Sequence, residues 1–227
     1  MKIGIICAVD TELQPFLPHI QNCKTSKKAM LTFYEGTIND VDIVTVFCGV
    51  GKTNAAIATQ ILIDTYGTDI IINSGTAGGM DINLDLFDTV ISTEAIHHDV
   101  HEGILTQFQP WMPSVSIKAD EALLKAAKKA VTQLDIGSKA YFGRMVTGEK
   151  FIEDDGRDEI LSAFGPLTVD METASIAHVC YVNSIPYIAV RTVTDTAKHA
   201  GTDTFEKNCP PASVISKDIV LELLKNI

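Results

Sequence analysis

Short runs of β-branched residues alternate with helical patterns along the sequence, and this alternation strongly constrains the fold. Segment 69–73 reads Asp-Ile-Ile-Ile-Asn and is apolar on both faces, as expected for a central strand covered by helices on each side. We therefore predict an α/β fold with one domain over residues 1–227. Its expected architecture is a three-layer αβα sandwich around a mixed, largely parallel β-sheet.

The expected strands are 2–7, 42–48, 69–73, 89–95, 140–146 and 187–192. The expected helices are 11–17, 52–66, 119–134, 155–164, 172–182 and 212–226. Ligand sites in open α/β sheets form beyond the carboxyl ends of the strands. The predicted strand ends would bring two glycine clusters, several acids and an aromatic residue to one rim.

The charge balance excludes some partners. The chain has 29 Asp and Glu against 18 Lys and Arg, a net charge of −11. A partner with a phosphate backbone requires a basic face, so we expect neither nucleic-acid nor anionic-membrane binding. Neither do we find an apolar segment of the roughly 18 residues that a membrane helix needs. The five cysteines are scattered and form no Cys-x-x-Cys pair, which favours reduced thiols in a cytoplasmic protein.

Three carboxylates stand where a pocket is expected. Glu12 follows the first expected strand, and Asp195 follows the last one. Glu172 stands at the end of the short apolar stretch that includes Val169. Each acid has an alternative interpretation as a helix cap or first-turn residue, worth about 0.3–1 kcal/mol. Unpaired buried charge is costly and is normally kept for chemistry. Because all three lie at strand ends, we predict an enzyme that uses carboxylates, without a metal or a cofactor.

Two glycine motifs have different interpretations. Gly49-Val50-Gly51-Lys52-Thr53 resembles the end of a phosphate-binding P-loop, but Val46 stands where that motif requires its first glycine. We interpret 49–53 as a turn into the next helix that still lines a pocket. Segment 73–79 holds three glycines directly after the central strand. Glycines there let the backbone approach a ligand and leave amides free to bind oxygen.

Two further segments have no assigned chemistry. His97, His98 and His101 suggest a metal site, but adjacent strand residues point to opposite faces and no further ligand stands at a telling spacing. We interpret them as surface or loop-anchoring residues. The apolar segment 108–113 holds the only tryptophan, and such a patch typically covers a site or contacts a partner chain.

Several motifs occur in a characteristic order along the chain: 1–6 with Glu12, 49–52, 71–79, 170–174 and 191–195. Together they resemble the bacterial 5′-methylthioadenosine/S-adenosylhomocysteine nucleosidases of the purine nucleoside phosphorylase and uridine phosphorylase superfamily. The resemblance implies a nucleoside phosphorylase-like fold and hydrolysis of the bond between adenine and a 5′-thio-substituted ribose, in methionine salvage and recycling of S-adenosylmethionine by-products. Methylthioadenosine, adenosylhomocysteine and 5′-deoxyadenosine are all possible substrates.

The resemblance also implies residue roles. Asp195 matches the general acid that protonates adenine N7, and Glu12 matches the general base for the attacking water. Glu172 matches the glutamate that binds the ribose hydroxyls, near the positive charge that grows as the base leaves. The other matched substrate-binding residues are Thr76, Ala77, Gly78, Phe151, Ile152, Met171, Arg191, Thr194 and Phe205.

Within the resemblance, Phe151 stacks on adenine, the Ile152 backbone bonds its edge, Arg191 holds the water and Phe205 closes over the site. The family forms homodimers in which a neighbour's loop lines the 5′-alkylthio pocket, and segment 104–113 lies in that region. Three positions depart from the family pattern: Val9 replaces a common methionine, and Thr76 and Thr194 replace common serines. The loop between Glu94 and Lys118 is slightly shorter than usual.

Two alternatives to the nucleosidase remain open at this stage. A phosphorylase of the same superfamily would use phosphate, which needs cations, whereas Asp10 and Glu12 in the first loop would repel it. A non-catalytic nucleoside-binding module would use the same scaffold without turnover. Retention of all three acids argues against that module.

Overall fold

The computed structural model describes residues 1–109, 111–134 and 139–227. The strands are β1 (Lys2–Cys7), β2 (Gln21–Lys28), β3 (Leu31–Ile38), β4 (Val41–Phe47), β5 (Ile70–Gly79), β6 (Thr89–His97), β7 (Ile117–Lys118), β8 (Ala140–Thr147), β9 (Thr168–Asp170) and β10 (Tyr187–Asp195). The helices are α1 (Asp10–Leu13), a 3₁₀ helix (Gln14–His19), α2 (Lys52–Asp64), α3 (Glu102–Gln107), α4 (Glu121–Gln133), α5 (Arg157–Phe164), α6 (Thr173–Val182) and α7 (Thr202–Leu224).

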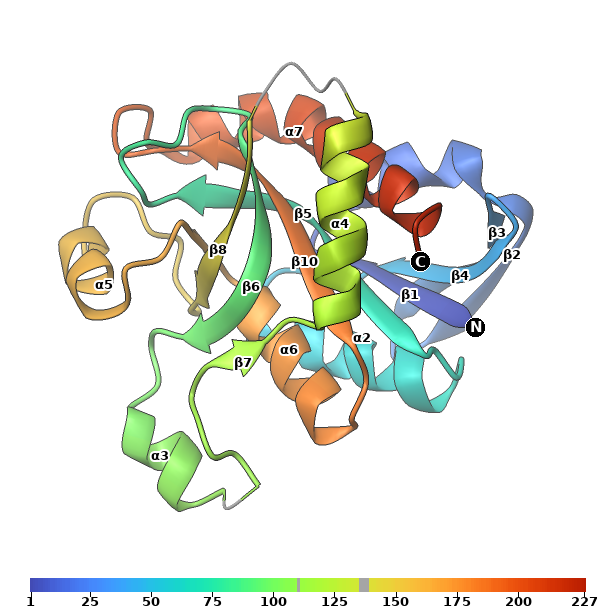
Figure 1. Cartoon of the computed structure of the whole chain (residues 1–227), viewed down its shortest axis with the longest axis horizontal. Helices are drawn as coiled ribbons and strands as arrows, with labels where there is room; N and C mark the ends of the chain where they lie inside the picture. Colours follow the sequence, from blue (N-terminus) through green and yellow to red (C-terminus); the bar gives the residue numbers. More distant parts are fainter. Residues whose placement is uncertain (110, 135–138) are drawn as a thin grey trace.

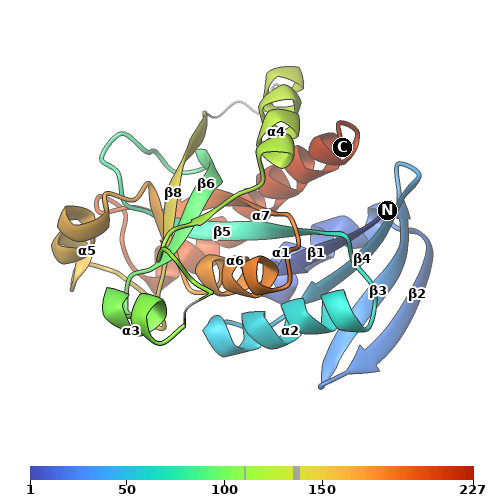
Figure 2. The ribbon, with the colours of Figure 1, turned by 60° about the horizontal axis from the view of Figure 1, so that its bottom comes forward.

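The central strand β5 separates two apolar cores, which confirms the predicted three-layer α/β architecture. Ile70 and Ile72 belong to one core, together with residues of α4 and α7. Ile71 points to the opposite side and belongs to the second core, with residues of α2 and α6. Figure 1 shows α4 and α7 on one side of the sheet, and Figure 2 shows α2 and α6 on the other. Consecutive isoleucines on a buried strand produce this arrangement, because neighbouring side chains of a strand point to opposite faces of the sheet.

The sheet is mixed, and part of it closes on itself. Strands β4, β1, β5 and β10 pair in parallel. β10 also pairs antiparallel with β6, and the pairings β6–β8, β8–β9 and β9–β5 complete a ring of five strands. At the other end, β3 and β2 extend the sheet as a hairpin beyond β4. The parallel strands all end at the same side of the molecule, where the site described below lies.

Several elements differ from the sequence prediction. The short strands β7 and β9 and the helix α3 were not predicted. The hairpin β2–β3 was not predicted, because β2 is mostly exposed and lacks an apolar alternation. β5 continues to Gly79, so the glycines of 73–79 lie in the strand and not in a loop after it. Helix α7 begins at Thr202, ten residues before the expected start at 212, and includes Pro210 and Pro211. Prolines normally end helices, but buried residues such as Asn208 and Cys209 hold this first part of α7 against the protein.

The described residues contain no helix that is both long and apolar enough to cross a membrane.

Candidate active site

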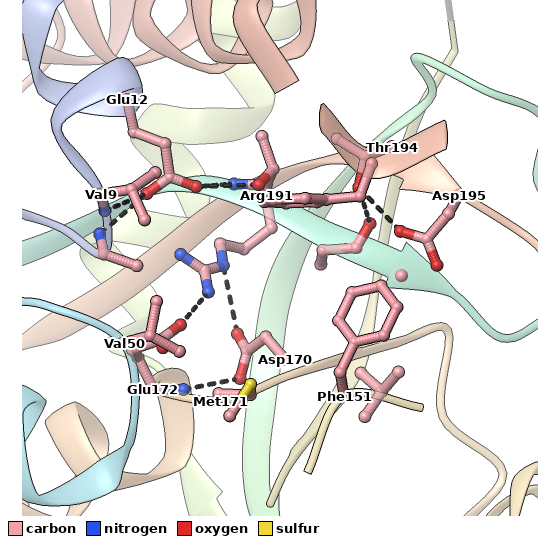
Figure 3. Close-up of a pocket in the computed structure, with 16 residues that line it drawn as sticks. Val9, Glu12, Val50, Phe151, Asp170, Met171, Glu172, Arg191, Thr194 and Asp195 are labelled. Carbon is pink, nitrogen blue, oxygen red and sulfur yellow. Dashed lines mark hydrogen bonds and ion pairs between the residues drawn. The ribbon is translucent and has the colours of Figure 1, made fainter. Parts of the chain in front are cut away.

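The carboxyl ends of the parallel strands enclose a cavity of about 150 Å³. Figure 3 shows the side chains that surround it, with Glu12 and Asp195 on opposite sides and Phe151 and Met171 below them. The lining residues are Ala8, Val9, Glu12, Val50, Thr76, Ala77, Gly78, Phe151, Val169, Asp170, Met171, Glu172, Arg191, Thr194, Asp195 and Phe205.

The cavity brings together almost all of the residues singled out from the sequence. The exception is Ile152, which is buried in a small apolar cluster with Met80 and Val146 and does not line the cavity with its side chain. Asp170 lines the cavity but was missed as a site residue, although it stands at the end of β9 beside Met171. Its position as an acid at the end of a strand could have identified Asp170 as a site residue.

Glu12 is held by hydrogen bonds from Thr76 on β5 and from the backbone directly after β1. Its Oε1 accepts from Thr76 N at 2.7 Å and Thr76 Oγ1 at 2.8 Å. Its Oε2 accepts from Ala8 N at 2.7 Å and Val9 N at 3.3 Å. The carboxylate is almost fully buried. Because both oxygens face donors, the orientation of Glu12 is fixed before any substrate arrives.

Arg191 connects two other acids beneath Glu12. Its Nη2 donates to Glu172 Oε2 at 2.7 Å, and its Nε lies 3.1 Å from Asp170 Oδ2. Gly51 N donates to Glu172 Oε1 at 2.9 Å. Thus the glycine turn before α2 binds a carboxylate of the protein. Val50 of this turn lines the cavity, as the interpretation of 49–53 as a pocket-lining turn predicted. All three charged side chains are buried.

Burial and the close contact of Arg191 with two acids shift the pKa values of Glu172 and Arg191. Burial, with the neighbouring charges of Asp170 and Glu12, raises the pKa of Glu172 to about 7, against the lowering effects of Arg191 and Gly51. Burial alone would lower the pKa of Arg191, but the carboxylates Asp170, Glu12 and Glu172 raise it well above its usual value. Arg191 therefore stays cationic while Glu172 can change its protonation near neutral pH.

Asp195 ends β10 on the far side of the cavity. Its Oδ1 accepts a hydrogen bond from Thr194 Oγ1 at 2.8 Å. Burial raises the pKa of Asp195, partly offset by this hydroxyl and by the charge of Arg157. A carboxyl group with a raised pKa keeps its proton closer to neutral pH and can act as a proton donor.

Two glycines of β5 set the distance between Glu12 and Asp195. A Cβ at Gly75 would lie 2.5 Å from the Glu12 carboxyl, and one at Gly78 would lie 3.1 Å from Asp195 Oδ2. Both acids therefore approach the same strand at positions three residues apart, which corresponds to about 10 Å of extended chain.

The cavity has an aromatic side. The rings of Phe151 and Phe205 meet edge to face, with centroids 6.0 Å apart. Phe151 comes from the loop after β8 and Phe205 from the first turn of α7. Figure 3 places Phe151 below Asp195, so a flat heterocycle that reaches the acid would pack against this ring.

Comparison with known proteins agrees with this geometry. The family model described as "Phosphorylase superfamily" matches residues 2–225. A 5′-methylthioadenosine/S-adenosylhomocysteine nucleosidase from Staphylococcus carnosus is 34% identical over 229 residues, which cover 99% of this chain and 100% of the relative. The chain belongs to the nucleosidases of the phosphorylase superfamily.

Two solved structures support membership of the phosphorylase superfamily. The 5′-methylthioadenosine/S-adenosylhomocysteine nucleosidase from Colwellia psychrerythraea was solved in complex with adenine. It matches this chain with a TM-score of 0.91 and 33% sequence identity, and the match covers 100% of this chain and 95% of that one. The enzyme from Neisseria meningitidis, in complex with methylthio-immucillin-A, has a TM-score of 0.91 and 30% identity, covering 100% and 99%. The predicted nucleoside phosphorylase-like fold is thus confirmed.

The two threonines that depart from the nucleosidase pattern both use their hydroxyl groups. Thr76 Oγ1 donates to Glu12 and Thr194 Oγ1 donates to Asp195. A serine would supply the same hydroxyl, so these departures keep the hydrogen bonds. Val9 lines the cavity.

The histidine-rich segment lies outside the cavity of this nucleosidase. His97 is buried and contacts the ring of His178, and burial lowers the pKa of His97 to about 4. Among the described residues no cluster of three or more His, Cys, Asp or Glu side chains could hold a metal ion. Next to these histidines, Asp99 pairs with Lys52 at 2.7 Å, which ties the segment to α2.

Gly75→Ala tests the placement of Glu12 in this phosphorylase-superfamily site. The added methyl group would overlap the Glu12 carboxyl, so we expect Glu12 to be displaced and kcat to fall about 100-fold. Ser74→Ala is the matched control, because the Ser74 hydroxyl faces Ser216 and not the cavity. Wild-type turnover by Gly75→Ala would show that the position of Glu12 is unimportant.

Proposed function

We propose that the protein hydrolyses the N-glycosidic bond of 5′-methylthioadenosine and S-adenosylhomocysteine, and also of 5′-deoxyadenosine, releasing adenine and the ribose product. The observation that carries the proposal is the placement of Glu12 and Asp195 on opposite sides of one cavity. Hydrolysis with a water on the opposite face from the leaving group requires such a separation between acid and base.

In the proposed reaction, Asp195 gives its proton to adenine N7, so that adenine leaves as a neutral base. The ribose then carries positive charge, which the nearby carboxylate of Glu172 stabilises. Glu12 accepts a proton from the attacking water. Met171 packs under the ribose, and Phe151 stacks on the base while the Ile152 backbone bonds the edge of adenine.

Arg191 fits a role in holding the water. Its Nη1 is buried and has no hydrogen-bond partner among the described residues. Figure 3 shows the guanidinium between Glu12 above and the pair Asp170 and Glu172 below. A water that donates to Glu12 could accept from Nη1, which would satisfy the otherwise unpaired donor.

Phosphate is a poorer nucleophile for this site. Arg191 is the one Lys or Arg among the described lining residues, and Asp170 and Glu172 already pair with it. A phosphate dianion beside Glu12 would meet a carboxylate and no free positive charge.

Incubation with methylthioadenosine in phosphate-free buffer tests the proposal. We expect free adenine and methylthioribose, with a rate that does not change when phosphate is added. Adenine release that depends strictly on phosphate, with a sugar 1-phosphate as product, would establish the phosphorylase instead. Binding without any release would establish the non-catalytic module.

We further propose that the protein is a cytoplasmic homodimer in which segment 104–113 lies near the partner's active site. Pro110 of this segment lies outside the described residues. Ile104, Phe108 and Trp111 are 53%, 76% and 58% exposed, and Figure 2 shows α3 on the same side of the sheet as α2 and α6. Association would bury this apolar surface. The five free cysteines, four of them buried, favour the cytoplasm.

Trp111→Asp tests the dimer. A charge at the exposed Trp111 should shift the protein from dimer to monomer in light scattering and raise KM for methylthioadenosine about tenfold or more. Asp40→Asn, at an exposed turn between β3 and β4, is a control that should stay dimeric. A wild-type protein that is monomeric and fully active would exclude the arrangement.

A further inference from the structure

Arg157 is a buried cation that the reaction described above does not use. It is the first residue of α5, and its side chain is only 5% exposed. Its hydrogen bonds go to uncharged groups: Nε donates to Glu153 O at 2.9 Å, and Nη1 donates to Gly79 O at 2.7 Å and contacts Met80 Sδ at 3.4 Å. Nη2 is buried without a partner among the described residues. A guanidinium in such surroundings costs free energy, which points to a purpose beyond packing.

The two carbonyls that Arg157 binds belong to different parts of the adenine end of the cavity. Glu153 lies in the loop between β8 and α5 that carries Phe151 and Ile152. Gly79 ends β5, directly after Gly78, whose Cβ position lies 3.1 Å from Asp195 Oδ2. One side chain therefore links the loop of the stacking ring to the strand that faces the acid.

We propose that Arg157 is a positioning residue of the adenine subsite, holding the loop of Phe151 and Ile152 against the end of β5 while its charge acts on Asp195. The inference rests on the proposed function, because it concerns the acid and the base-stacking ring of that reaction. Arginine suits this task better than lysine, since its planar group can donate in two directions at once.

Charge provides a second line of support. The charged groups that act on Asp195 are Arg157, which lowers its pKa, and Glu153, which raises it, against a larger increase from burial. Arg157 thus limits how firmly Asp195 retains its proton. An acid that must both give and regain a proton in each turnover works best when its pKa is near the working pH.

The experiment compares Arg157→Met, Arg157→Lys and Glu153→Gln, using kcat, KM and the alkaline limb of the pH profile. Arg157→Met should raise KM about tenfold, because two charge-assisted hydrogen bonds are lost, and should move the alkaline limb to higher pH. Arg157→Lys should keep the limb near that of the wild type but still raise KM. Glu153→Gln, at an exposed position, should move the limb to lower pH.

Arg144→Met is the matched control. Arg144 lies on β8 and donates to Phe164 O at the other end of α5, so its substitution removes an arginine that binds the same helix without touching Asp195. Its pH profile and KM should match the wild type. If Arg157→Met and Glu153→Gln also leave KM and the limb unchanged, or if Arg157→Met only lowers the melting temperature, the inference is wrong. Absence of adenine release by the wild-type protein would instead refute the proposed function.

Discussion

Asp195→Asn will release adenine about 10⁴-fold more slowly than the wild-type protein while still binding adenine. Asparagine has nearly the same shape and can accept the Thr194 hydroxyl, which lies 2.8 Å from Asp195 Oδ1, but it has no acidic proton to give. Steady-state assays and calorimetric titration with adenine measure the two effects separately. Asp40→Asn, on the exposed turn between β3 and β4, is the matched control. Equal activity of Asp195→Asn would remove the general-acid role and favour a site that works without this proton.

The same substitution should make the protein more stable at neutral pH. Burial raises the pKa of Asp195 above its ordinary value of 3.8, so the folded protein binds this proton more firmly than the unfolded chain does. The stability that comes from this proton is present at low pH and is lost as pH rises through the folded pKa. Asparagine carries no such penalty. The difference in melting temperature between variant and wild type should therefore grow as pH rises from below 3.8 through the folded pKa of Asp195, and a constant difference would contradict the expectation.

Glu12→Gln should lower kcat about 10³-fold and, unlike Asp195→Asn, should also destabilise the fold. Both oxygens of Glu12 accept from backbone N–H groups, of Thr76 on one side and of Ala8 and Val9 on the other. Whichever way a glutamine amide turns, its NH₂ group faces a donor. Leaving a buried donor unpaired costs about 1–3 kcal/mol. Urea unfolding measures this loss, and Glu35→Gln, at a half-exposed position of β3 outside the cavity, is the control.

The two substitutions together separate catalysis from folding. If Glu12→Gln kept more than a tenth of the wild-type kcat, Glu12 would not be the base that activates water. If it lost activity but not stability, the four hydrogen bonds would be weaker than their distances indicate. The opposite signs expected for the stability of the two variants follow from their surroundings: Asp195 has one hydroxyl donor, whereas Glu12 has donors on both oxygens.

The layers of the fold and most of the cavity could be predicted from the sequence because their signals are local. Ile70, Ile71 and Ile72 in a row require cover on both faces, and an acid at a strand end is visible without a structure. The hairpin β2–β3 has no such signal, since its first strand is exposed and polar. In α7, Pro210 and Pro211 led to a predicted start that is too late, because tertiary packing maintains the helix before them. Here local preference and tertiary contacts disagreed, and the contacts decided the structure.

Two features of the site depend on contacts between distant residues and could not be predicted. Gly75 must lack a side chain because Glu12, 63 positions earlier, occupies that space. Arg157 reaches Gly79 across 78 positions, and nothing near it in the sequence marks it as different from a surface arginine. The roles of the catalytic and substrate-binding residues stay predictions until the variants above are measured.

Closure of β5, β9, β8, β6 and β10 into a ring has a consequence for solubility during folding. A strand with free backbone groups on one side can recruit a strand of another molecule and start aggregation. Ring closure removes that hazard from one end of the sheet, which leaves β2 as the long unprotected border. Lys24, Lys27 and Lys28 lie along β2, and repulsion between such lysines on two molecules disfavours intermolecular pairing at this open edge of the sheet.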